Sequence, residues 1–319
     1  MAGTIIVVGA GMAGLACATR LAAAGQQVSL FDKGRGPGGR MATRRAEVEG
    51  KTHRFDHGAQ FFTARDDGFR ARVEEWQRAG VVARWQAAGE EAWVGTPAMN
   101  APIRAAAEPL DVSWGTRVAG IQSRDEGWLV SLDDGAERFS DSIVLAIPAE
   151  QAAELLAGLH DDFADRARRT ASRPCWALMA VFPDRLECLD TLRGDDGEAV
   201  SWAARNGAKP GRDGSESWVV HASPEWSEAH LEDDAASVAA RLLDAFLHQS
   251  GAGARAPVHM AAHRWRYAMA DPVDGPPALW DATRKLGVCG DWLIAPRVES
   301  AWVSGTRLAE TMLDSIDVH

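Results

Sequence analysis

The sequence predicts an α/β protein in which a unit built on a parallel sheet is interrupted by a second unit with a mixed or antiparallel sheet. Residues 4–9 form a short apolar run, rich in β-branched side chains and ended by glycine, which is typical of a buried parallel strand. A helical pattern follows at once, whereas residues 117–140 and 176–222 hold short strand-like runs separated by turns. With 319 residues, 46% of them hydrophobic, the chain is long enough for about two domains.

The first helix and the second strand follow from residue spacing. Leu15 and Leu21 mark an apolar helical face, and Gly25 is a suitable residue to end the helix. Residues 27–32 then give a second apolar strand that ends at Asp32. The chain therefore opens with a β–α–β unit.

The pattern changes after this unit. Phe69, Val73 and Trp76 share one face of an amphipathic helix that we expect from about residue 66 to residue 88. We interpret this helix as an insertion outside the first unit. A small antiparallel meander and then a buried strand should follow, and their strand ranges are 117–122, 128–132, 138–140 and 142–147.

The remaining elements complete a second sheet and return to the first. Strands are predicted at 176–182, 199–205 and 217–222, then a helix at 233–249, a short strand at 283–290 and a closing helix at 304–316. The two units are therefore discontinuous in the sequence. We expect the first to comprise residues 1–65, 101–152 and 286–319, and the second residues 66–100 and 153–285.

The charge of the chain disfavours several classes of partner. A formal net charge of −11 at pH 7 opposes unspecific binding to nucleic acid or to an anionic membrane, because Lys and Arg provide most of the attraction to both. Residues 5–18, the longest apolar stretch, are interrupted by glycines and fit neither a secretion signal nor a membrane span. We expect a cytoplasmic protein with no evident protein partner.

Cysteine and histidine spacing indicates no metal site. The four cysteines are scattered without a CxxC pair, and the histidines lack HxH or HExxH spacing. No GxSxG motif of a nucleophilic hydrolase occurs either. We expect structural thiols and no bound metal.

The strongest motif is a GxGxxG sequence at the junction of the first strand and the first helix. Gly9 permits a tight turn, Gly11 lets the backbone approach a pyrophosphate, and Gly14 allows close helix packing. The helix N-terminus then suits a pyrophosphate, and the carboxylate of Asp32 suits a ribose hydroxyl. The first unit is thus predicted to be a Rossmann-like dinucleotide-binding domain.

An extended version of this motif resembles the FAD-binding signature of the amine oxidase superfamily. The glycine motif continues through Leu21, Gly25 and Asp32 to a second glycine-rich segment, Gly38-Gly39-Arg40. The resemblance implies a Rossmann-like FAD-binding domain with an inserted mixed or antiparallel substrate domain, as in the amine oxidase and p-hydroxybenzoate hydroxylase topology. It also implies that Arg40 pairs with the FAD diphosphate, a role that suits a guanidinium group.

Further segments are similar to bacterial renalases along almost the whole chain. They are DHGAQFF at residues 56–62, WVGTPAMN at 93–100, SWAARN at 201–206, GDW at 290–292 and ESAW at 299–302, before the last helix. The resemblance implies an oxidase with noncovalent FAD. Such an enzyme takes hydride from the 2- or 6-dihydro isomers of NAD(P) and passes the electrons to O2, giving hydrogen peroxide. Its partners are therefore a small dinucleotide substrate and O2.

The resemblance also implies a set of site residues. No protein side chain is expected to be catalytic, because the flavin itself accepts the hydride. The expected cofactor-binding residues are Gly9, Ala10, Gly11, Met12, Ala13, Gly14, Asp32, Lys33, Gly39, Arg40, Met41, Gly58, Ala59, Gln60, Phe61, Val118, Gly290, Asp291, Ser300, Ala301 and Trp302.

Candidate substrate-binding residues come from two segments of the second unit and from the DHGAQFF segment. Residues 263–267 alternate along a predicted strand, so that His263, Trp265 and Tyr267 share one face and Arg264 and Arg266 the other. The expected substrate-binding residues are Gln60, Trp202, Arg205, His263, Trp265 and Tyr267, and Arg173, Arg205 and Arg266 are candidate partners for an anionic dinucleotide.

Two other functions remain open at this point. An FAD-dependent amine oxidase or desaturase would share the cofactor domain while oxidising a C–N or C–C bond. A flavin-binding sensor, in which FAD is structural, would use the same fold for another purpose. A basic dinucleotide pocket favours the renalase-type reaction, whereas an aromatic cage for a neutral amine favours an amine oxidase.

Overall fold

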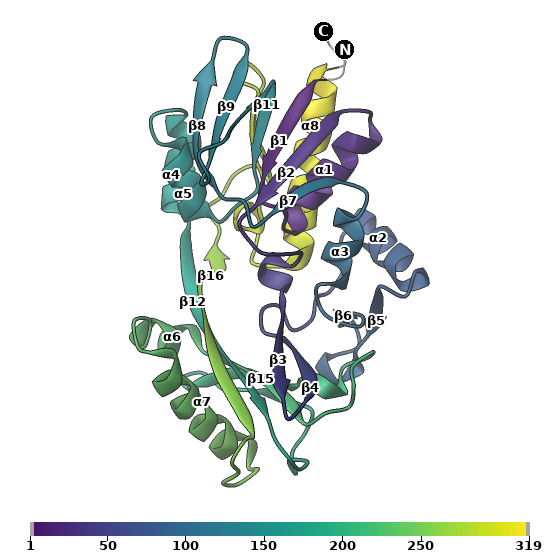
Figure 1. Cartoon of the computed structure of the whole chain (residues 1–319), viewed down its shortest axis with the longest axis vertical. Coiled ribbons are helices and arrows are strands. Elements are labelled where there is room, and N and C mark those ends of the chain that lie inside the picture. The colour runs from purple at the N-terminus through teal and green to yellow at the C-terminus, as the bar shows by residue number, and fades with distance from the viewer. Residues whose placement is uncertain (1–2, 317–319) are drawn as a thin grey trace.

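A six-stranded sheet lies in the part of the molecule drawn at the top of Figure 1, with five parallel strands and one antiparallel edge strand. The structure, a computed structural model, describes residues 3–316. In spatial order the strands are β17 (Leu279–Asp281), β18 (Leu286–Val288), β11 (Ser142–Leu145), β1 (Thr4–Val8), β2 (Gln27–Asp32) and β7 (Asp111–Trp114).

Strand β1 is buried on both faces of this sheet. Ile5 and Val7 belong to one hydrophobic cluster, whereas Ile6 and Val8 belong to another. This burial explains why the strand is an almost continuous apolar run rather than an alternating one.

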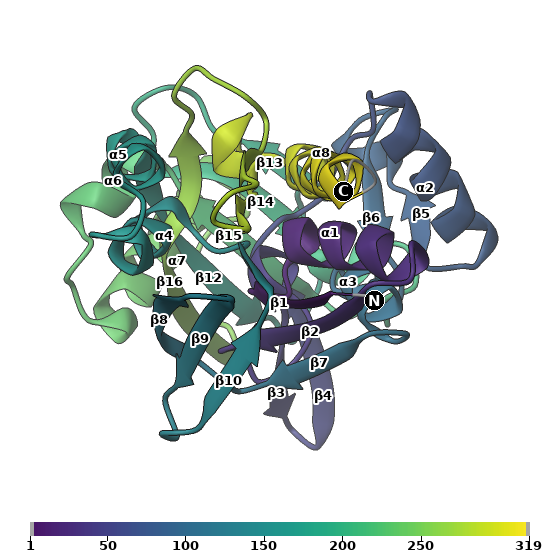
Figure 2. The same ribbon diagram turned by 90° about the horizontal axis from the view of Figure 1, so that it is seen from above.

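Helices α1 (Met12–Ala23) and α8 (Val298–Ile316) cover one face of the sheet side by side, as Figure 2 shows. A Cβ atom added to Gly305 of α8 would lie 2.0 Å from the carbonyl oxygen of Ala13, so the two helix backbones are in direct contact. The other face packs against an antiparallel meander and two helices. These elements are β8 (Val118–Arg124), β9 (Gly127–Leu132), β10 (Glu137–Ser140), α4 (Ala149–Leu156) and α5 (Asp161–Arg169).

A five-stranded antiparallel sheet forms the lower part of the molecule in Figure 1. In spatial order its strands are β13 (Thr191–Arg193), β14 (Val200–Arg205), β15 (Ser217–Ala222), β12 (Ala171–Val181) and β16 (His259–Asp271). Helix α7 (Ala235–Ser250) buries Val238, Leu242 and Phe246 against this sheet, as its spacing predicted, and α6 (Pro224–Ala229) precedes it.

Two hairpins and two helices connect the sheets. The hairpins are β3 (Thr43–Val48) with β4 (Lys51–Asp56), and β5 (Val82–Arg84) with β6 (Trp93–Gly95). The helices are α2 (Asp67–Arg78) and α3 (Ala101–Ala107). Val48 and Phe55 of the first hairpin pack against Met179 and Val219 of the five-stranded sheet.

Two predicted helix boundaries were wrong. The helix expected from residue 66 to residue 88 ends at Arg78, because Gly80 adopts φ 72° and the following Val82 enters β5. The last helix begins at Val298 rather than at residue 304, so Ser300 and Trp302 lie inside α8 and not before it.

The predicted fold class is confirmed, with a Rossmann-like parallel sheet and a separate antiparallel sheet. The chain enters the six-stranded sheet in several separate segments. Strand β17 joins that sheet although it lies within residues 153–285, and residues 317–319 of the expected first unit lie outside the described residues. Within the described range, none of the helices has the length and apolar character of a membrane span.

Candidate functional site

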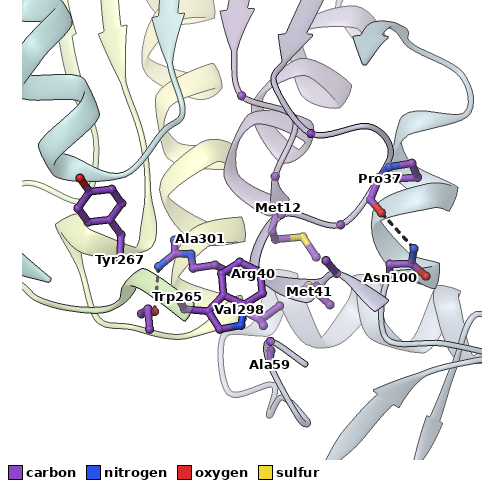
Figure 3. A pocket seen from close by; sticks show the side chains of 18 of the residues that line it. Met12, Pro37, Arg40, Met41, Ala59, Asn100, Trp265, Tyr267, Val298 and Ala301 are labelled. Atoms are coloured by element: carbon purple, nitrogen blue, oxygen red, sulfur yellow. Dashed lines mark hydrogen bonds between the residues drawn. The ribbon is translucent and has the colours of Figure 1, made fainter. Parts of the chain in front are cut away.

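A large cavity lies between the two sheets. Its volume is about 2240 Å³, which exceeds the roughly 300–1,000 Å³ typical of pockets for small ligands. Its wall includes the β1–α1 turn, the end of β2, residues 33–45 and 57–63, and the start of α8. Strands β12 to β16 also contribute to it. Figure 3 shows Met12, Met41 and Ala59 together with Trp265 and Tyr267 of β16 around this space.

The β1–α1 turn brings backbone close to the cavity. Gly9 has φ 101°, and a Cβ atom on Gly14 would lie 2.0 Å from the Gly9 carbonyl oxygen, so both positions require glycine. Gly11 lines the cavity, and nothing lies within 4 Å of where its Cβ atom would be. Gly11 also begins helix α1 without a side-chain cap, which leaves the first helix N–H groups near the cavity free for an anionic ligand.

The Asp32 carboxylate at the end of β2 joins two turns. It accepts hydrogen bonds from Ala10 N and Gly34 N, each at 2.7 Å. A carboxylate has further acceptor positions, and Asp32 lines the cavity. It is therefore placed to accept from a hydroxyl group of a ligand.

The glycine-rich segment and the DHGAQFF segment meet at Arg40. Ala59 N donates to the Arg40 carbonyl oxygen at 2.8 Å, and a Cβ atom on Gly58 would lie 2.0 Å from that oxygen. The Arg40 guanidinium forms an ion pair with Asp291, in the short helix η4 (Asp291–Leu293), and donates to Ala268 O at 3.4 Å. Arg40 thus connects both sides of the cavity (Figure 3).

The start of α8 is fixed by a side chain of its own first turn. Glu299 accepts from Arg65 N at 2.5 Å and from Asp66 N at 2.6 Å. Val298 and Ala301 line the cavity beside it. The positive end of the helix dipole therefore lies at the cavity wall.

Three rings form one aromatic cluster where the DHGAQFF segment meets strand β16. The ring centroids of His57, His263 and Trp265 lie 4.6 to 5.0 Å apart. Trp265 Nε1 donates to His57 O at 2.8 Å, which fixes the indole. His57 Nδ1 is buried and has no hydrogen-bond partner among the described residues.

A second aromatic group surrounds Trp202 of β14. Its ring centroid lies 5.3 Å from that of Phe61, and the Arg193 guanidinium lies 4.6 Å over the Trp202 ring. Trp202 Nε1 is buried without an acceptor in the described part of the chain, although Trp202 lines the cavity.

A buried charge cluster lies behind Gln60. Asp56 Oδ2 accepts from Lys209 Nζ at 3.3 Å and from Arg212 Nη2 at 2.6 Å, and Lys209 also donates to Gln60 Oε1 at 3.1 Å. Burial alone would raise the pKa of Asp56, but the two cations and their hydrogen bonds hold it well below its usual value. Burial lowers the pKa of Lys209 to about 8, against the opposing effect of Asp56.

Comparison with known protein families agrees with this geometry. Residues 78–313 match the family model of flavin-containing amine oxidoreductases, and residues 7–75 match that of NAD(P)-binding Rossmann-like domains. The chain belongs to the flavin-containing amine oxidoreductases.

Solved structures of other flavin enzymes share the whole fold. A protein of Exiguobacterium sp. 255-15, provisionally described as a protoporphyrinogen oxidase, matches with a TM-score of 0.77 and 11% identity over 99% of both chains. Putrescine oxidase bound to putrescine matches with a TM-score of 0.73 and 15% identity, over 98% of this chain and 99% of the other. Cyclohexylamine oxidase from Brevibacterium oxydans IH-35A matches with a TM-score of 0.73 and 12% identity, over 99% and 100%. At these low sequence identities, the structural similarity shows only that the fold is shared.

This flavin-containing oxidoreductase uses FAD, and its cavity fits the cofactor. The glycine turn at Gly9 and Gly11, the α1 N-terminus and the Asp32 carboxylate match the pyrophosphate and ribose of a dinucleotide. The volume of the cavity leaves space for a second molecule beside the cofactor.

The structure brings most of the residues expected to bind FAD to the cavity wall. The exceptions are Ala10, Gly14, Ser300 and Trp302, which do not line it. Gly14 and Trp302 are packing residues: Gly14 contacts Gly9, and the Trp302 ring lies 5.5 Å from that of Phe69. Of the expected substrate residues, Gln60, Trp202, His263, Trp265 and Tyr267 line the cavity.

Arg205 does not belong to the cavity, and its expected role was wrong. It is 1% exposed and forms ion pairs with Asp190 and Glu216. Arg173 and Arg266 are also neutralised, the first by Glu225 and Glu228 and the second by Glu232. These three arginines have carboxylate partners that are distant in the sequence or on another element. Sequence position alone therefore could not exclude them as partners for an anionic dinucleotide.

Four arginines that face the cavity from the β3–β4 hairpin and the five-stranded sheet, without a carboxylate partner, were missed. Arg44, Arg45, Arg54 and Arg193 line the cavity, and none forms an ion pair with a described acidic side chain. Arg44, Arg45 and Arg54 lie on a hairpin whose two-residue turn, Glu49-Gly50, has positive φ at both positions. A two-residue turn between two alternating runs was the sequence signal that could have located this hairpin.

We expect the cavity histidines to make folding sensitive to acid. Burial is the main cause that lowers the pKa of His57 and of His221 to about 4, so both are neutral in the folded chain at pH 7. Between about pH 6.5 and 4 the unfolded chain therefore binds more protons than the folded chain. As the pH is lowered through this range, the free energy of unfolding should fall by about 1.4 kcal/mol per pH unit for each histidine. Urea denaturation across this range measures the slope.

His221→Gln should show a shallower slope than the unmodified chain, whereas His248→Gln, at an exposed position on α7, should leave it unchanged. An unchanged slope in His221→Gln would show that His221 does not titrate in this way.

Proposed function

We propose that the chain is a renalase-type oxidase, which converts the 2- or 6-dihydro isomers of NAD(P) to NAD(P)+ while O2 is reduced to hydrogen peroxide. Each turnover consumes one dihydronicotinamide, one O2 and one proton, and releases one NAD(P)+ and one hydrogen peroxide. FAD, when bound, accepts the hydride and passes the two electrons to O2.

The observation that carries this proposal is the charge of the cavity wall formed by the β3–β4 hairpin and the five-stranded sheet. The cavity-lining residues of β3, β4 and β12 to β16 include Arg44, Arg45, Arg54 and Arg193. No acidic residue of these strands lines the cavity. The acidic residues that line the cavity, such as Asp32 and Asp291, belong to the parts around the six-stranded sheet. A wall of this kind attracts a polyanionic dinucleotide and repels an alkylammonium ion.

The aromatic rings of the wall support the same substrate. The flat indole and imidazole rings of Trp202, His263 and Trp265 suit the face of a dihydropyridine. Loss of hydride from the 2- or 6-dihydro ring restores aromaticity and requires no proton removal, which agrees with neutral histidines at this wall.

The chain's own residues would hold and orient the two molecules. We propose that Gly11, Asp32, Arg40 and the N-terminus of α8 bind FAD, in a noncovalent way. Cys175 is the only cysteine that lines the cavity among the described residues, and burial raises its pKa to about 12, so its thiol remains protonated. A helix N-terminus of this kind contributes about 1–2 kcal/mol toward a nearby negative charge in favourable geometry.

An FAD-dependent amine oxidase or desaturase is the second candidate. The names of two structural neighbours, putrescine oxidase and cyclohexylamine oxidase, indicate that those enzymes act on amines. Their low identity to this chain means that their substrates do not transfer with the fold. An amine that is neutral and aromatic would suit the rings of this wall better than a diamine.

Anaerobic stopped-flow absorbance tests the proposal. The holoenzyme is mixed with borohydride-reduced NAD, which contains the 2-, 4- and 6-dihydro isomers, with pure 4-dihydro NADH, and with putrescine, cyclohexylamine and tyramine. We expect rapid bleaching of the flavin by the 2- or 6-isomer, slow bleaching by 4-dihydro NADH and none by the amines. Admission of air should restore the absorbance and release hydrogen peroxide. Bleaching by an amine alone would assign the second candidate instead.

A further inference from the structure

Hairpin β3–β4 places two arginines opposite each other. Arg45 and Arg54 are direct cross-strand partners, so their side chains project from the same face of the ladder. Directly opposed like charges destabilise a strand pair, and an anion between the two side chains would relieve the repulsion. Neither arginine forms an ion pair with an acidic residue between positions 3 and 316, and Glu47, on the same face, accepts from Thr52 Oγ1 instead.

The hairpin also faces the cavity. Arg44, Arg45 and Arg54 all contribute to its wall, and all three are exposed at the side chain. Arg44 projects from the other face of the ladder, opposite Phe55. After burial, the charge of Arg44 is a further cause that lowers the pKa of both His57 and His263, which shows that it lies near the aromatic cluster. Positive charge therefore extends from the aromatic cluster to the exposed part of the hairpin.

We infer that Arg45 and Arg54 form an anion site that binds the diphosphate of the dinucleotide substrate. The inference rests on the proposed function for the identity of the substrate, and it specifies which part of the substrate the hairpin recognises. Guanidinium groups bind phosphate oxygens through two parallel hydrogen bonds, and such a ligand would neutralise the Arg45–Arg54 repulsion. The FAD diphosphate has a separate place, at the α1 N-terminus and Arg40.

This site gives the chain affinity for a dinucleotide without any role in the chemical step. We expect the hairpin to hold the diphosphate equally before and during hydride transfer, which is uniform binding and changes no barrier of the bound complex. The hairpin should therefore determine the dissociation constant of the substrate, and leave the limiting rate of flavin reduction unchanged. A dihydropyridine without phosphate groups should gain nothing from it.

Calorimetric titration of the holoenzyme with ADP-ribose tests the anion site directly. In the double variant Arg45→Gln/Arg54→Gln the dissociation constant for ADP-ribose should rise at least about tenfold, and its salt dependence should weaken. Lys51→Gln is the matched control, because Lys51 lies on the same hairpin outside the cavity wall. It removes a positive charge from β4 and should leave the dissociation constant unchanged. The double variant should unfold at the same temperature as the unmodified holoenzyme or higher, since it removes a like-charge pair.

Stopped-flow reduction separates this inference from the proposed function. With borohydride-reduced NAD, the double variant should show a similar rise in dissociation constant and a limiting rate within about twofold of the unmodified enzyme. Borohydride-reduced N-methylnicotinamide, which has no phosphate, should react equally well with both. If the double variant binds ADP-ribose as tightly as the unmodified enzyme, or if neither binds it, the anion site is wrong, whatever the outcome with the dihydro isomers. If ADP-ribose binding follows the expectation and no isomer bleaches the flavin, the anion site stands and the proposed reaction fails.

Discussion

Replacement of Asp56 by alanine should cost about 3–5 kcal/mol of folding free energy, because Lys209 and Arg212 would then be buried without a counter-charge. All three side chains are almost fully buried, so solvent cannot compensate the loss. Asp56 also accepts from Met99 N at 2.9 Å, and that donor would lose its partner too. Urea denaturation of the apoprotein at pH 7 measures the difference.

The exposed Asp213 provides a matched control for this substitution. It lies in the same loop region as Arg212, and Asp213→Ala changes the net charge by the same amount. We expect an effect below about 1 kcal/mol there. Adding Lys209→Met to Asp56→Ala should recover part of the loss, since one unpaired cation is then removed. Equal stability of Asp56→Ala and Asp213→Ala would contradict the assignment of Asp56 as the counter-ion.

The contribution of Asp56 to folding stability should depend on pH in a defined direction. The folded chain holds the pKa of Asp56 below its unfolded value of about 3.9. Its contribution to stability is therefore complete above that pH and decreases as the pH falls toward the folded-state pKa. The difference in stability between the unmodified chain and Asp56→Ala should narrow below about pH 4, because protonated Asp56 no longer neutralises Lys209 and Arg212.

Two glycines of the same turn should differ in how their replacement by alanine affects folding. In Gly14→Ala the new methyl group would lie 2.0 Å from the Gly9 carbonyl oxygen and 3.1 Å from the Ala146 Cβ atom, so backbone must move. Forced packing of this kind costs about 1–3 kcal/mol or more, and the distorted turn should lose FAD as well. Apoprotein unfolding and calorimetric titration with FAD measure both effects.

Gly11→Ala should instead affect FAD and spare the fold. Nothing lies within 4 Å of the new methyl group, and the φ of −79° is accessible to alanine. The loss at this N-cap position should be at most about 1 kcal/mol. The methyl group would project into the cavity where the cofactor backbone must approach, so FAD affinity should fall at least about tenfold. Unchanged FAD affinity in Gly11→Ala would show that the pyrophosphate does not pass this turn.

Local patterns were sufficient for the elements that position the cofactor. Strand β1, helix α1 and strand β2 follow from a buried apolar run, a helical spacing and the glycine motif, all within the first 32 residues. The same reasoning placed helix α7 and most of the antiparallel strands. It failed at the end of α2, because Gly80 ends a helix whose apolar spacing continues in the sequence.

The substrate side of the cavity was less accessible to sequence reasoning. Trp202, His263 and Trp265 were found because motif resemblance and strand alternation identify a face. Arg205 was assigned wrongly and Arg45 and Arg54 were missed, because the free or paired state of an arginine depends on its neighbours in space. The buried contact between Asp56 and Lys209 joins residues 153 positions apart, and no local pattern contains it.

The sequence by itself determined the fold class and the flavoprotein family, since backbone hydrogen bonding, glycine turns and apolar periodicity are properties of short segments. Only the tertiary structure decided which charges are neutralised and which face the cavity. The reason is physical: a charge acts over several ångströms in all directions, and its effect depends on the burial and partners that distant segments bring to it. Arg205, held by Glu216 and Asp190, and Arg45, which lies opposite Arg54, are the same residue type in different electrostatic surroundings for that reason.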